Sequence, residues 1–318
     1  MTLTTQKTAP SVPPELLRAA FQLFLQRDPN PQARNQFADF GALIGALFGS
    51  KEFLASAQAQ KTNLPWPERQ YFIARDLGIL YCPIGKNACS FFKRAMVTLA
   101  QHPARAVLDR SIHQLTDHIC TGLQLSDYSE TEIDAIWRDP DLYSFAILRD
   151  PLRRLLSAYI EKFVVNRLDA ANLRYHTGPV IEAVQKAQGL ETPDYHRGIR
   201  FRDFVNHILS QPPEQLDPHW RPQHLYLGAH RWSALYDFDH LDRAVQDLEQ
   251  MSGIELKRPP VNRSGSGVGQ AHFGADQLLP EVLDKLPMIE AESFFPDEIR
   301  AKIRQYYAQD VALMAQTR

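Results

Sequence analysis

Two segments of the chain place a basic side chain between an apolar run and a helical pattern. In the first, ILYCPIGKNACSFFKR, Lys86 lies in the turn after the apolar run, and Ser90 lies in the first turn of the following helix. Backbone N–H groups and the helix dipole at a helix start bind anions, and a lysine adds a mobile positive charge. The segment predicts a cradle for phosphate or sulfate, although it also fits a surface turn with a solvated lysine.

The second segment, SFAILRDPLRRLLSAY, has the same organisation. Its apolar run predicts a strand that ends before Arg149, while Asp150 suits a helix N-cap and Pro151 the first helical position. Arg149 therefore lies at the carboxyl end of a strand, where open α/β sheets bind ligands. Taken alone, the segment also fits a well-capped helix with a surface arginine cluster.

Apolar runs and helical spacing alternate from about residue 65 onward. Strand–turn–helix units in series predict a parallel sheet covered by helices. The expected fold is α/β, with a P-loop-like parallel sheet flanked by helices and a small all-helical extension before it. The expected strands are 77–82, 104–108 and 143–148, and the expected helices are 88–100, 151–164, 201–209, 244–251 and 296–315.

The first part of the chain has a different composition. Residues 1–14 are mostly polar and contain three prolines, which predicts a flexible tail. Residues 15–62 show helical spacing, with Ser50 as a candidate cap, and predict a helical module. The main domain is expected at 65–318.

The composition excludes several classes of protein. The 318 residues are 44% hydrophobic and carry a net charge of −2, so no general basic field attracts nucleic acid. The three cysteines, Cys82, Cys89 and Cys120, form neither a disulfide framework nor a zinc-binding spacing. The N-terminus lacks the apolar core of a signal peptide, and no apolar run approaches the roughly 18 residues of a membrane span. The sequence therefore predicts a soluble cytoplasmic protein.

The first basic segment differs from a Walker A loop. That loop has the form GxxxxGK[ST], but Leu80 stands at its first glycine and Asn87 at its magnesium-binding hydroxyl. An ATP-dependent kinase of the P-loop type is therefore only an alternative hypothesis.

Taken together, the two segments resemble the elements that bind 3′-phosphoadenosine-5′-phosphosulfate (PAPS) in sulfotransferases. The run Lys86-Asn87-Ala88-Cys89-Ser90 resembles the 5′-phosphosulfate loop, and Arg149 with Ser157 resembles the 3′-phosphate element. The form RDPLRRLLSAY is similar to that of the family 2 carbohydrate sulfotransferases and their bacterial relatives.

Other segments extend the resemblance over roughly residues 70–310. The segments DPHWRPQ at 217–223 and PVNRS at 260–264 resemble further elements of the same family. The missing anchor and disulfide pattern favour the bacterial branch. Near the N-terminus, AFQLFLQRDPNPQARNQF and GALFGSKEFL resemble helical modules, related to phycobilisome-linker-like domains, of bacterial glycan-processing enzymes.

The resemblance implies in-line transfer of a sulfuryl group from PAPS to a hydroxyl of a carbohydrate or glycoconjugate. Lys86 is then expected at the 5′-phosphate and bridging oxygen, with Ser90 and the N–H groups of residues 88–90 beside it. Arg149 and Ser157 are expected at the 3′-phosphate, and Arg263 is a further candidate for the nucleotide site. No metal is expected. Cys89 is expected to pack rather than react.

A general base must accept the proton of the acceptor hydroxyl, and histidine suits this role near neutral pH. His113 is the first choice because it follows the expected strand 104–108, and His219 in HWRPQ is the second. A non-catalytic glycan-binding protein on the same scaffold is a further alternative.

Overall fold

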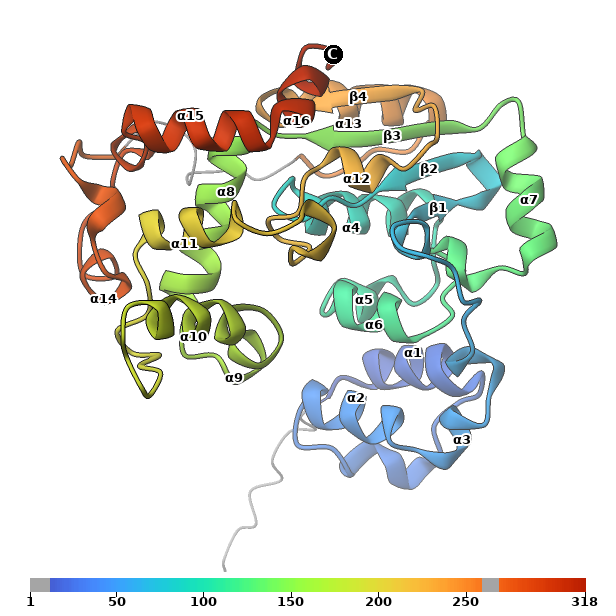
Figure 1. Ribbon diagram of the computed structural model, residues 1–318. Helices are drawn as coiled ribbons and strands as arrows, with labels where there is room; N and C mark the ends of the chain where they lie inside the picture. Colours follow the sequence, from blue (N-terminus) through green and yellow to red (C-terminus); the bar gives the residue numbers. More distant parts are fainter. Residues whose placement is uncertain (1–11, 259–268) are drawn as a thin grey trace, which may run out of the picture. The chain divides into compact units, whose positions relative to one another are not determined.

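The computed structural model describes residues 12–258 and 269–318 (Figure 1). The chain forms two compact units. The first comprises Met1–Pro83, Ser90–Ser144 and Leu248–Lys257, and the second comprises Ile84–Cys89, Phe145–Asp247 and Arg258–Arg318.

Four strands form a mixed sheet in the order β1-β2-β3-β4. In the first unit, β1 pairs antiparallel with β2, and in the second unit β3 pairs parallel with β4. The strands β2 and β3 are almost wholly buried, which explains their continuous apolar sequence. The strand predicted at 143–148 is confirmed, and the run at 77–82 contains a shorter one, but the antiparallel β1 was not predicted. The strands are β1 (Phe72–Ala74), β2 (Ile79–Cys82), β3 (Tyr143–Leu148) and β4 (Ala234–Asp237).

The first unit begins with the predicted helices of the N-terminal region. Ser50 caps α3 as expected, since its hydroxyl oxygen accepts the Phe53 N–H at 3.1 Å. The rings of Phe24, Phe48 and Phe53 pack together with centroids 4.8 to 5.7 Å apart. Apart from Cys89, which belongs to the second unit, the helices of the first unit are α1 (Pro14–Leu25), α2 (Phe40–Phe48), α3 (Lys51–Leu54), α4 (Cys89–Leu99), α5 (Arg105–Leu108), α6 (Ile112–His118) and α7 (Glu130–Arg138).

The strand predicted at 104–108 is wrong, because residues 105–108 form the helix α5 and Ala104 is its N-cap. Ala104, Val107 and Leu108 are buried, whereas Ala106 is exposed. Buried positions three and four residues apart lie on one face of a helix, and a run this short does not distinguish that pattern from a buried strand. His113 consequently lies in α6, which follows a helix rather than a strand.

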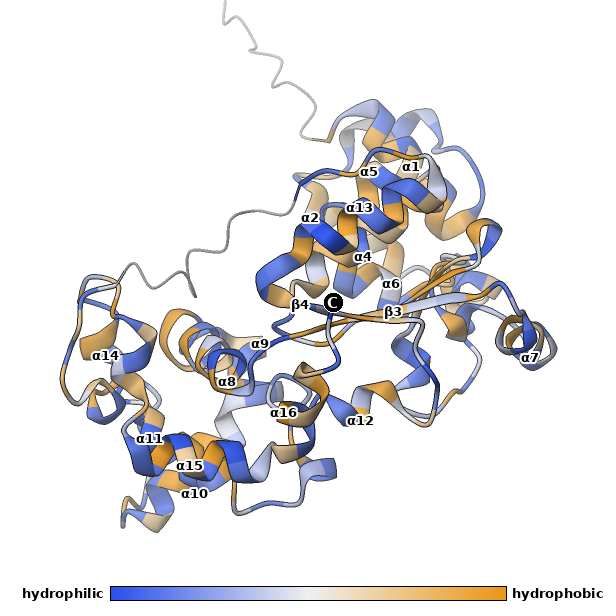
Figure 2. Cartoon of the chain, turned by 90° about the horizontal axis from the view of Figure 1, so that it is seen from above, coloured by the Kyte–Doolittle hydropathy of each residue, from blue (hydrophilic) through white to orange (hydrophobic). Residues whose placement is uncertain are grey.

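The second unit is mainly helical. Its helices are α8 (Pro151–Tyr159), α9 (Ala170–Asn172), α10 (Gly178–Ala187), α11 (Phe201–Ile208), α12 (His224–Leu227), α14 (Pro280–Leu283), α15 (Asp297–Tyr306) and α16 (Ala308–Met314), and α13 (Leu241–Ser252) extends into the first unit. π-Helical turns follow α8 at Ile160–Val165 and α9 at Leu173–Thr177. The helices α8, α11 and α15 contact one another, and Figure 2 shows apolar and polar residues on α11 and α15.

Aromatic residues fill the core beneath these helices. The Phe163 ring lies 4.8 Å from the Phe204 ring, which lies 5.4 Å from the ring of Trp220. The predicted helices at 201–209, 244–251 and 296–315 are confirmed, the last as two helices. In the part of the chain that the structure describes, no helix has the length and apolar character needed to cross a bilayer.

Candidate functional site

The turn after β2 has an uncommon backbone conformation. Lys86 and Ala88 have positive φ angles of 71° and 55°. Such strained residues cluster at ligand sites, and left-handed residues form part of backbone nests, whose N–H groups make anion-binding concavities. The helix α4 starts at Cys89, directly after this turn. The local backbone therefore has the form expected of an anion cradle.

Asn87 anchors this turn within the second unit. Its buried side chain donates from Nδ2 to the Ile147 carbonyl at 2.7 Å and to Oε1 of Gln223 at 2.6 Å. Gln223 also accepts the Arg149 N–H at 3.0 Å and donates to the Arg149 carbonyl at 2.8 Å. One glutamine thus holds both predicted anion-binding segments. Sequence reasoning missed this role, although Gln223 lies in the HWRPQ segment.

Arg149 links the two segments through its side chain as well. Its Nη1 donates to the Lys86 carbonyl at 3.0 Å, and its guanidinium carbon lies 4.1 Å from the centroid of the Phe238 ring. The residue is 3% exposed, and its Nε has no hydrogen-bond partner among the residues that the structure describes. Burial lowers the pKa of Arg149 to about 10, while Asp239 opposes this shift. A buried cation with an unpaired donor is suited to an anionic ligand.

The Lys86 ammonium pairs with the Glu161 carboxylate, which lies in the π-helical turn after α8. Burial alone would raise the pKa of Glu161, but the positive charge of Lys86 reverses this effect, so the pKa falls below its usual range. Sequence reasoning missed Glu161, because its distance of 75 residues from Lys86 leaves no local signal.

Arg154 anchors the same turn through hydrogen bonds to backbone carbonyls. Its guanidinium donates to the carbonyls of Gly85 at 3.0 Å, Arg221 at 2.8 Å and Pro218 at 3.2 Å, and the residue is 2% exposed. Ser157 lies half-buried in the next turn of α8. The 3′-phosphate role expected for Ser157 stays a prediction, whereas Arg154 is a structural residue.

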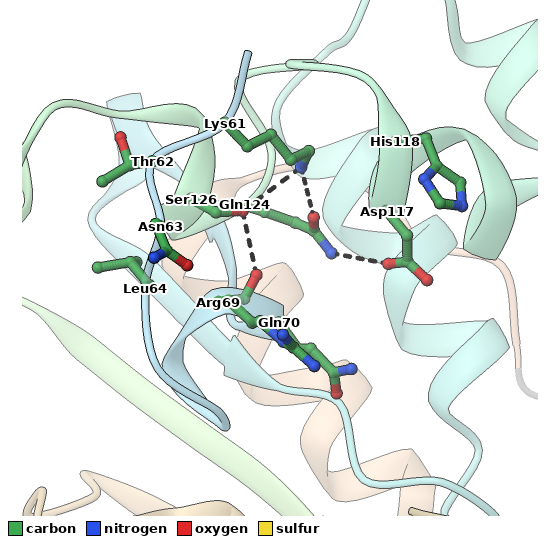
Figure 3. Close-up of a pocket in the computed structure, with 10 residues that line it drawn as sticks. All are labelled: Lys61, Thr62, Asn63, Leu64, Arg69, Gln70, Asp117, His118, Gln124 and Ser126. Atoms are coloured by element: carbon green, nitrogen blue, oxygen red, sulfur yellow. Dashed lines mark hydrogen bonds between the residues drawn. The ribbon is translucent and has the colours of Figure 1, made fainter. Parts of the chain in front are cut away.

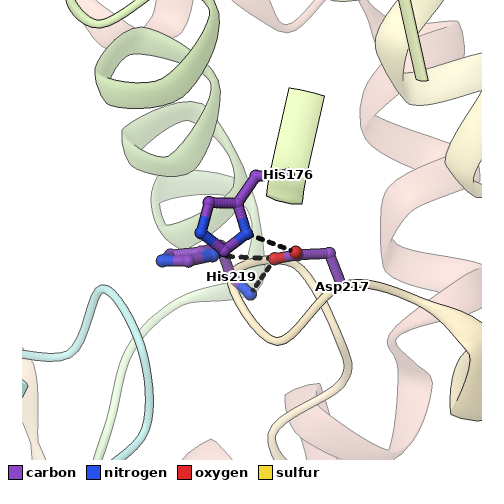
Figure 4. A group of neighbouring side chains, drawn as sticks. All are labelled: His176, Asp217 and His219. Atoms are coloured by element: carbon purple, nitrogen blue, oxygen red, sulfur yellow. Dashed lines mark hydrogen bonds and ion pairs between the residues drawn. The ribbon is translucent and has the colours of Figure 1, made fainter. Parts of the chain in front are cut away.

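His219 belongs to a cluster with His176 and Asp217 (Figure 4). Asp217 Oδ1 lies 2.7 Å from His219 Nδ1, and Asp217 Oδ2 lies 2.8 Å from His176 Nδ1. Burial lowers the pKa of His219 despite the opposing effect of Asp217, and the pKa of Asp217 also lies below its usual range because the two histidines outweigh its burial. A β-carbon built on Gly85 would lie 4.0 Å from His219 Cδ2. His219 is therefore adjacent to the turn that carries Lys86.

His113 has a different environment in the first unit. Its Nε2 lies 2.7 Å from the Ser90 hydroxyl, and its Nδ1 lies 3.1 Å from the Lys93 ammonium. An ammonium only donates, so Nδ1 must accept, and Nε2 then carries the proton toward Ser90. The side chain of Lys93 is buried, with its Nζ 3.9 Å from Asp117. Both ring nitrogens of His113 are therefore already engaged.

A polar pocket of about 330 Å³ lies within the first unit (Figure 3). The Lys61 ammonium in its wall donates to Gln124 at 2.7 Å and pairs with Asp127 at 2.5 Å. Arg69 also lines the pocket and is exposed. The lining residues are Lys61, Thr62, Asn63, Leu64, Arg69, Gln70, Asp117, His118, Gln124 and Ser126. Such a lining of hydrogen-bonding groups fits a polyhydroxylated or charged ligand.

The remaining sequence predictions concern Arg263 and the cysteines. Arg263 and the segment 260–264 lie outside the described residues. Cys82, Cys89 and Cys120 are free thiols, and burial raises the pKa of Cys82. A thiol with a raised pKa is a poor nucleophile, so Cys82 is a packing residue.

Comparisons with known proteins identify the family. Residues 69–314 match the model of the sulfotransferase family. The chain is 29% identical over 159 residues to carbohydrate sulfotransferase 14 of Danio rerio, covering 50% of this chain and 40% of that protein. It is 30% identical over 194 residues to the Homo sapiens protein of the same name, covering 60% and 47%.

A third relative aligns over a longer region. Carbohydrate sulfotransferase 10 of Homo sapiens is 26% identical over 251 residues, covering 75% of this chain and 63% of that protein. The chain spans about half the length of the first two relatives. No solved structure matches it significantly. The bacterial affiliation and the N-terminal likeness stay predictions, but the family match covers most of the described chain. The protein therefore belongs to the sulfotransferase family.

Proposed function

We propose that this protein is a PAPS-dependent sulfotransferase that transfers a sulfuryl group to a hydroxyl of a carbohydrate. The observation that carries the proposal is the hydrogen bond from Arg149 to the Lys86 carbonyl, which puts the two basic segments side by side in one compact unit. A nucleotide with phosphates at both its 5′ and 3′ positions requires two such cationic sites close together.

Lys86 supplies the positive charge at the 5′ side. When PAPS binds, the Lys86 ammonium moves from the Glu161 carboxylate to the bridging oxygen of PAPS. Negative charge develops on that oxygen as the sulfuryl group departs. Sulfuryl transfer resembles phosphoryl transfer, in which positioning and charge stabilisation provide most of the rate enhancement. Arg149 and Ser157 hold the 3′-phosphate, and the bidentate geometry of arginine suits that group.

His219 is the better candidate for the general base. Its Nδ1–H donates to Asp217, which leaves Nε2 as the acceptor that a base requires. It also lies against Gly85, next to Lys86. His113, the first choice from the sequence, has both ring nitrogens engaged by Ser90 and Lys93. We therefore assign proton transfer to His219 and its orientation to Asp217.

The carbohydrate acceptor is inferred from the names of the relatives, which are carbohydrate sulfotransferases. The polar pocket in the first unit supports this inference, because its hydrogen-bonding lining and the Arg69 cation match sugar hydroxyls or an acidic sugar. We propose that this pocket binds part of the acceptor.

A direct assay tests the proposal. The protein is incubated with PAPS labelled in its sulfuryl group and a panel of glycans, and products are detected by the mass of the added SO₃. We expect a sulfated glycan with the wild type and none with Lys86→Ala. Arg138→Ala on α7, a change at an exposed arginine, is the matched control and should retain activity. Equal activity of wild type and Lys86→Ala would overturn the assignment.

A P-loop kinase receives less support from the turn itself. Asn87 stands where a kinase needs a hydroxyl for magnesium, and its side chain is fully buried and bonded to Ile147 and Gln223. The same assay with ATP and Mg²⁺ should give no phosphorylated glycan.

A further inference from the structure

Three potential metal ligands converge beside the proposed base. His176 comes from the π-helical turn Leu173–Thr177, while Asp217 and His219 come from the segment before α12 (Figure 4). Each residue offers one ligand atom, and the three atoms lie within 4.8 Å of one another. We propose that His176, Asp217 and His219 bind a divalent transition metal such as Zn²⁺, and that the bound metal inhibits sulfuryl transfer. The inhibitory part rests on the function proposed above.

The ligand set indicates the class of metal. Two histidine nitrogens and one carboxylate oxygen are ligands that Zn²⁺ uses, with water in the fourth position. Mg²⁺ and Ca²⁺ prefer sites made of oxygen atoms and gain little from imidazole. The site should therefore take Zn²⁺, and Co²⁺ as its spectroscopic substitute, in preference to Mg²⁺.

The contacts of Asp217 show how metal and proton compete. The Nδ1–O distances of 2.7 and 2.8 Å are those of charge-assisted hydrogen bonds, and because an ionised carboxylate only accepts, each histidine donates its Nδ1–H in a hydrogen bond to Asp217. A metal can take the place of these two protons after the three side chains rotate slightly. The rotation is needed because two ligand atoms of one metal lie farther apart than a hydrogen-bond donor and its acceptor. The side chains are 29%, 13% and 24% exposed for His176, Asp217 and His219, which leaves room for the metal and its water to enter.

Metal binding changes the tautomer of His219. With Nδ1 bound to the metal, the proton that Nδ1 carried moves to Nε2, and the imidazole stays neutral with no net loss of a proton. Nε2 then carries a hydrogen and cannot accept one from the acceptor hydroxyl. The metal thus blocks the nitrogen to which we assign proton transfer, without displacing any residue of the nucleotide site.

The neighbouring charges partly offset each other. The positive charge of Lys162 acts on His219 and would repel an incoming cation. The ammonium of Lys162 lies 3.5 Å from the Glu161 carboxylate, so its repulsion of an incoming cation is reduced.

A Co²⁺ titration of the full-length protein tests the binding. Tetrahedral Co²⁺ gives intense visible absorption bands, and Zn²⁺ should abolish them by competition. We expect one Co²⁺ per chain for the wild type, and no displacement by Mg²⁺. In His176→Asn, the asparagine amide can keep the hydrogen bond to Asp217 but cannot act as an imidazole ligand. Its affinity should fall by more than the roughly 10- to 100-fold that loss of an outer partner costs.

His196→Asn is the matched control, because His196 is an exposed histidine of the same unit and should not affect the metal. Failure of the wild type to bind Co²⁺, or equal binding by His176→Asn, would overturn the site. Equal binding by the wild type and His196→Asn supports it, since the loss in His176→Asn is then not common to every histidine substitution in this unit.

A turnover assay with added Zn²⁺ tests the inhibition. The wild type should lose activity as the site fills, whereas His176→Asn should remain active and resist Zn²⁺. Full wild-type activity at saturating Zn²⁺ would overturn the inhibitory part. Metal binding without any sulfuryl transfer would contradict the proposed function but not the site. Transfer without metal binding would contradict only this inference.

Discussion

The Arg149 guanidinium donates a hydrogen bond to the Lys86 carbonyl at 3.0 Å, across a separation of 63 residues in the chain. The bond uses one nitrogen of the guanidinium, and within residues 12–258 and 269–318 Nε has no hydrogen-bond partner. Arg149 can therefore hold the Lys86 turn and still offer donors to a phosphate. This relationship joins the two sequence segments to which we assign nucleotide binding.

Arg149 should set the preference for a 3′-phosphate. In Arg149→Gln, the neutral amide retains a donor for the Lys86 carbonyl but loses the charge and the bidentate geometry. We expect the wild type to bind 3′-phosphoadenosine-5′-phosphate (PAP) more tightly than 5′-AMP, and the variant to lose about 10- to 100-fold of that preference. Calorimetry with both nucleotides measures the ratio. An unchanged ratio would assign the 3′-phosphate to another residue.

Turnover should depend on the neutral form of His219. Burial lowers the pKa of His219 below its usual value of 6.5, so the neutral imidazole predominates at neutral pH. We expect kcat/KM to be flat above pH 6.5 and to fall about tenfold per pH unit below the lowered pKa. His219→Gln should lower kcat by roughly 10² to 10⁴ with PAP affinity retained. The same loss in His113→Gln, with His219→Gln unaffected, would reverse the assignment.

Asp217 should contribute stability at neutral pH. Its pKa is lower in the folded protein than its usual value of 3.8, so folding favours the ionised carboxylate. The contribution is present above pH 3.8 and is lost as the pH falls toward the folded value. Asp217→Asn should therefore flatten the dependence of the free energy of unfolding on pH below about pH 4. Urea denaturation at several pH values measures this slope, and a slope equal to that of the wild type would contradict the account.

Arg154 should contribute to the stability of the fold through its hydrogen bonds, rather than to ligand binding through its charge. Arg154→Met leaves the carbonyls of Gly85, Arg221 and Pro218 without their buried donor. We expect the free energy of unfolding to fall by about 2 to 4 kcal/mol. The adjacent Arg153 is the control, because its contact with Asp239 at 3.4 Å is largely exposed and should contribute less than about 1 kcal/mol. Equal losses in Arg153→Met and Arg154→Met would contradict this reading.

Arg69 should affect the acceptor and not the nucleotide. It lines the polar pocket of the first unit, so Arg69→Ala should raise KM for the glycan several-fold and leave PAP affinity unchanged. Arg138→Ala provides the exposed control on the same unit. If Arg69→Ala weakens PAP binding and leaves the KM for the acceptor unchanged, the acceptor does not bind in this pocket.

The sequence predicted those parts of the site that have local signals. The Asp150-Pro151 pair marks the start of α8, and Asp150 indeed accepts the Arg153 N–H at 3.0 Å. The strand β3 was predicted because its long apolar run is buried on both faces. The run at 104–108 was misassigned because a run of five residues fits both helical and strand periodicity.

The contacts between distant residues left no such signal. His176 meets Asp217 across 41 residues, and Asn87 meets Gln223 across 136. The helical position of Arg154 does not show whether its guanidinium faces solvent or the carbonyls that it binds. Tertiary packing decides these partners, so the two turns that we propose bind anions were predictable from the sequence while the residues that support them were not.

Calorimetric titration of the metal-free protein with PAP is the most direct measurement of the central claim, that Lys86 and Arg149 bind opposite ends of one nucleotide. The account predicts one PAP per chain without Mg²⁺, and an affinity at least about tenfold lower in Lys86→Ala and in Arg149→Ala. Absence of PAP binding by the wild type, or tighter binding of ATP with Mg²⁺ than of PAP, would contradict it.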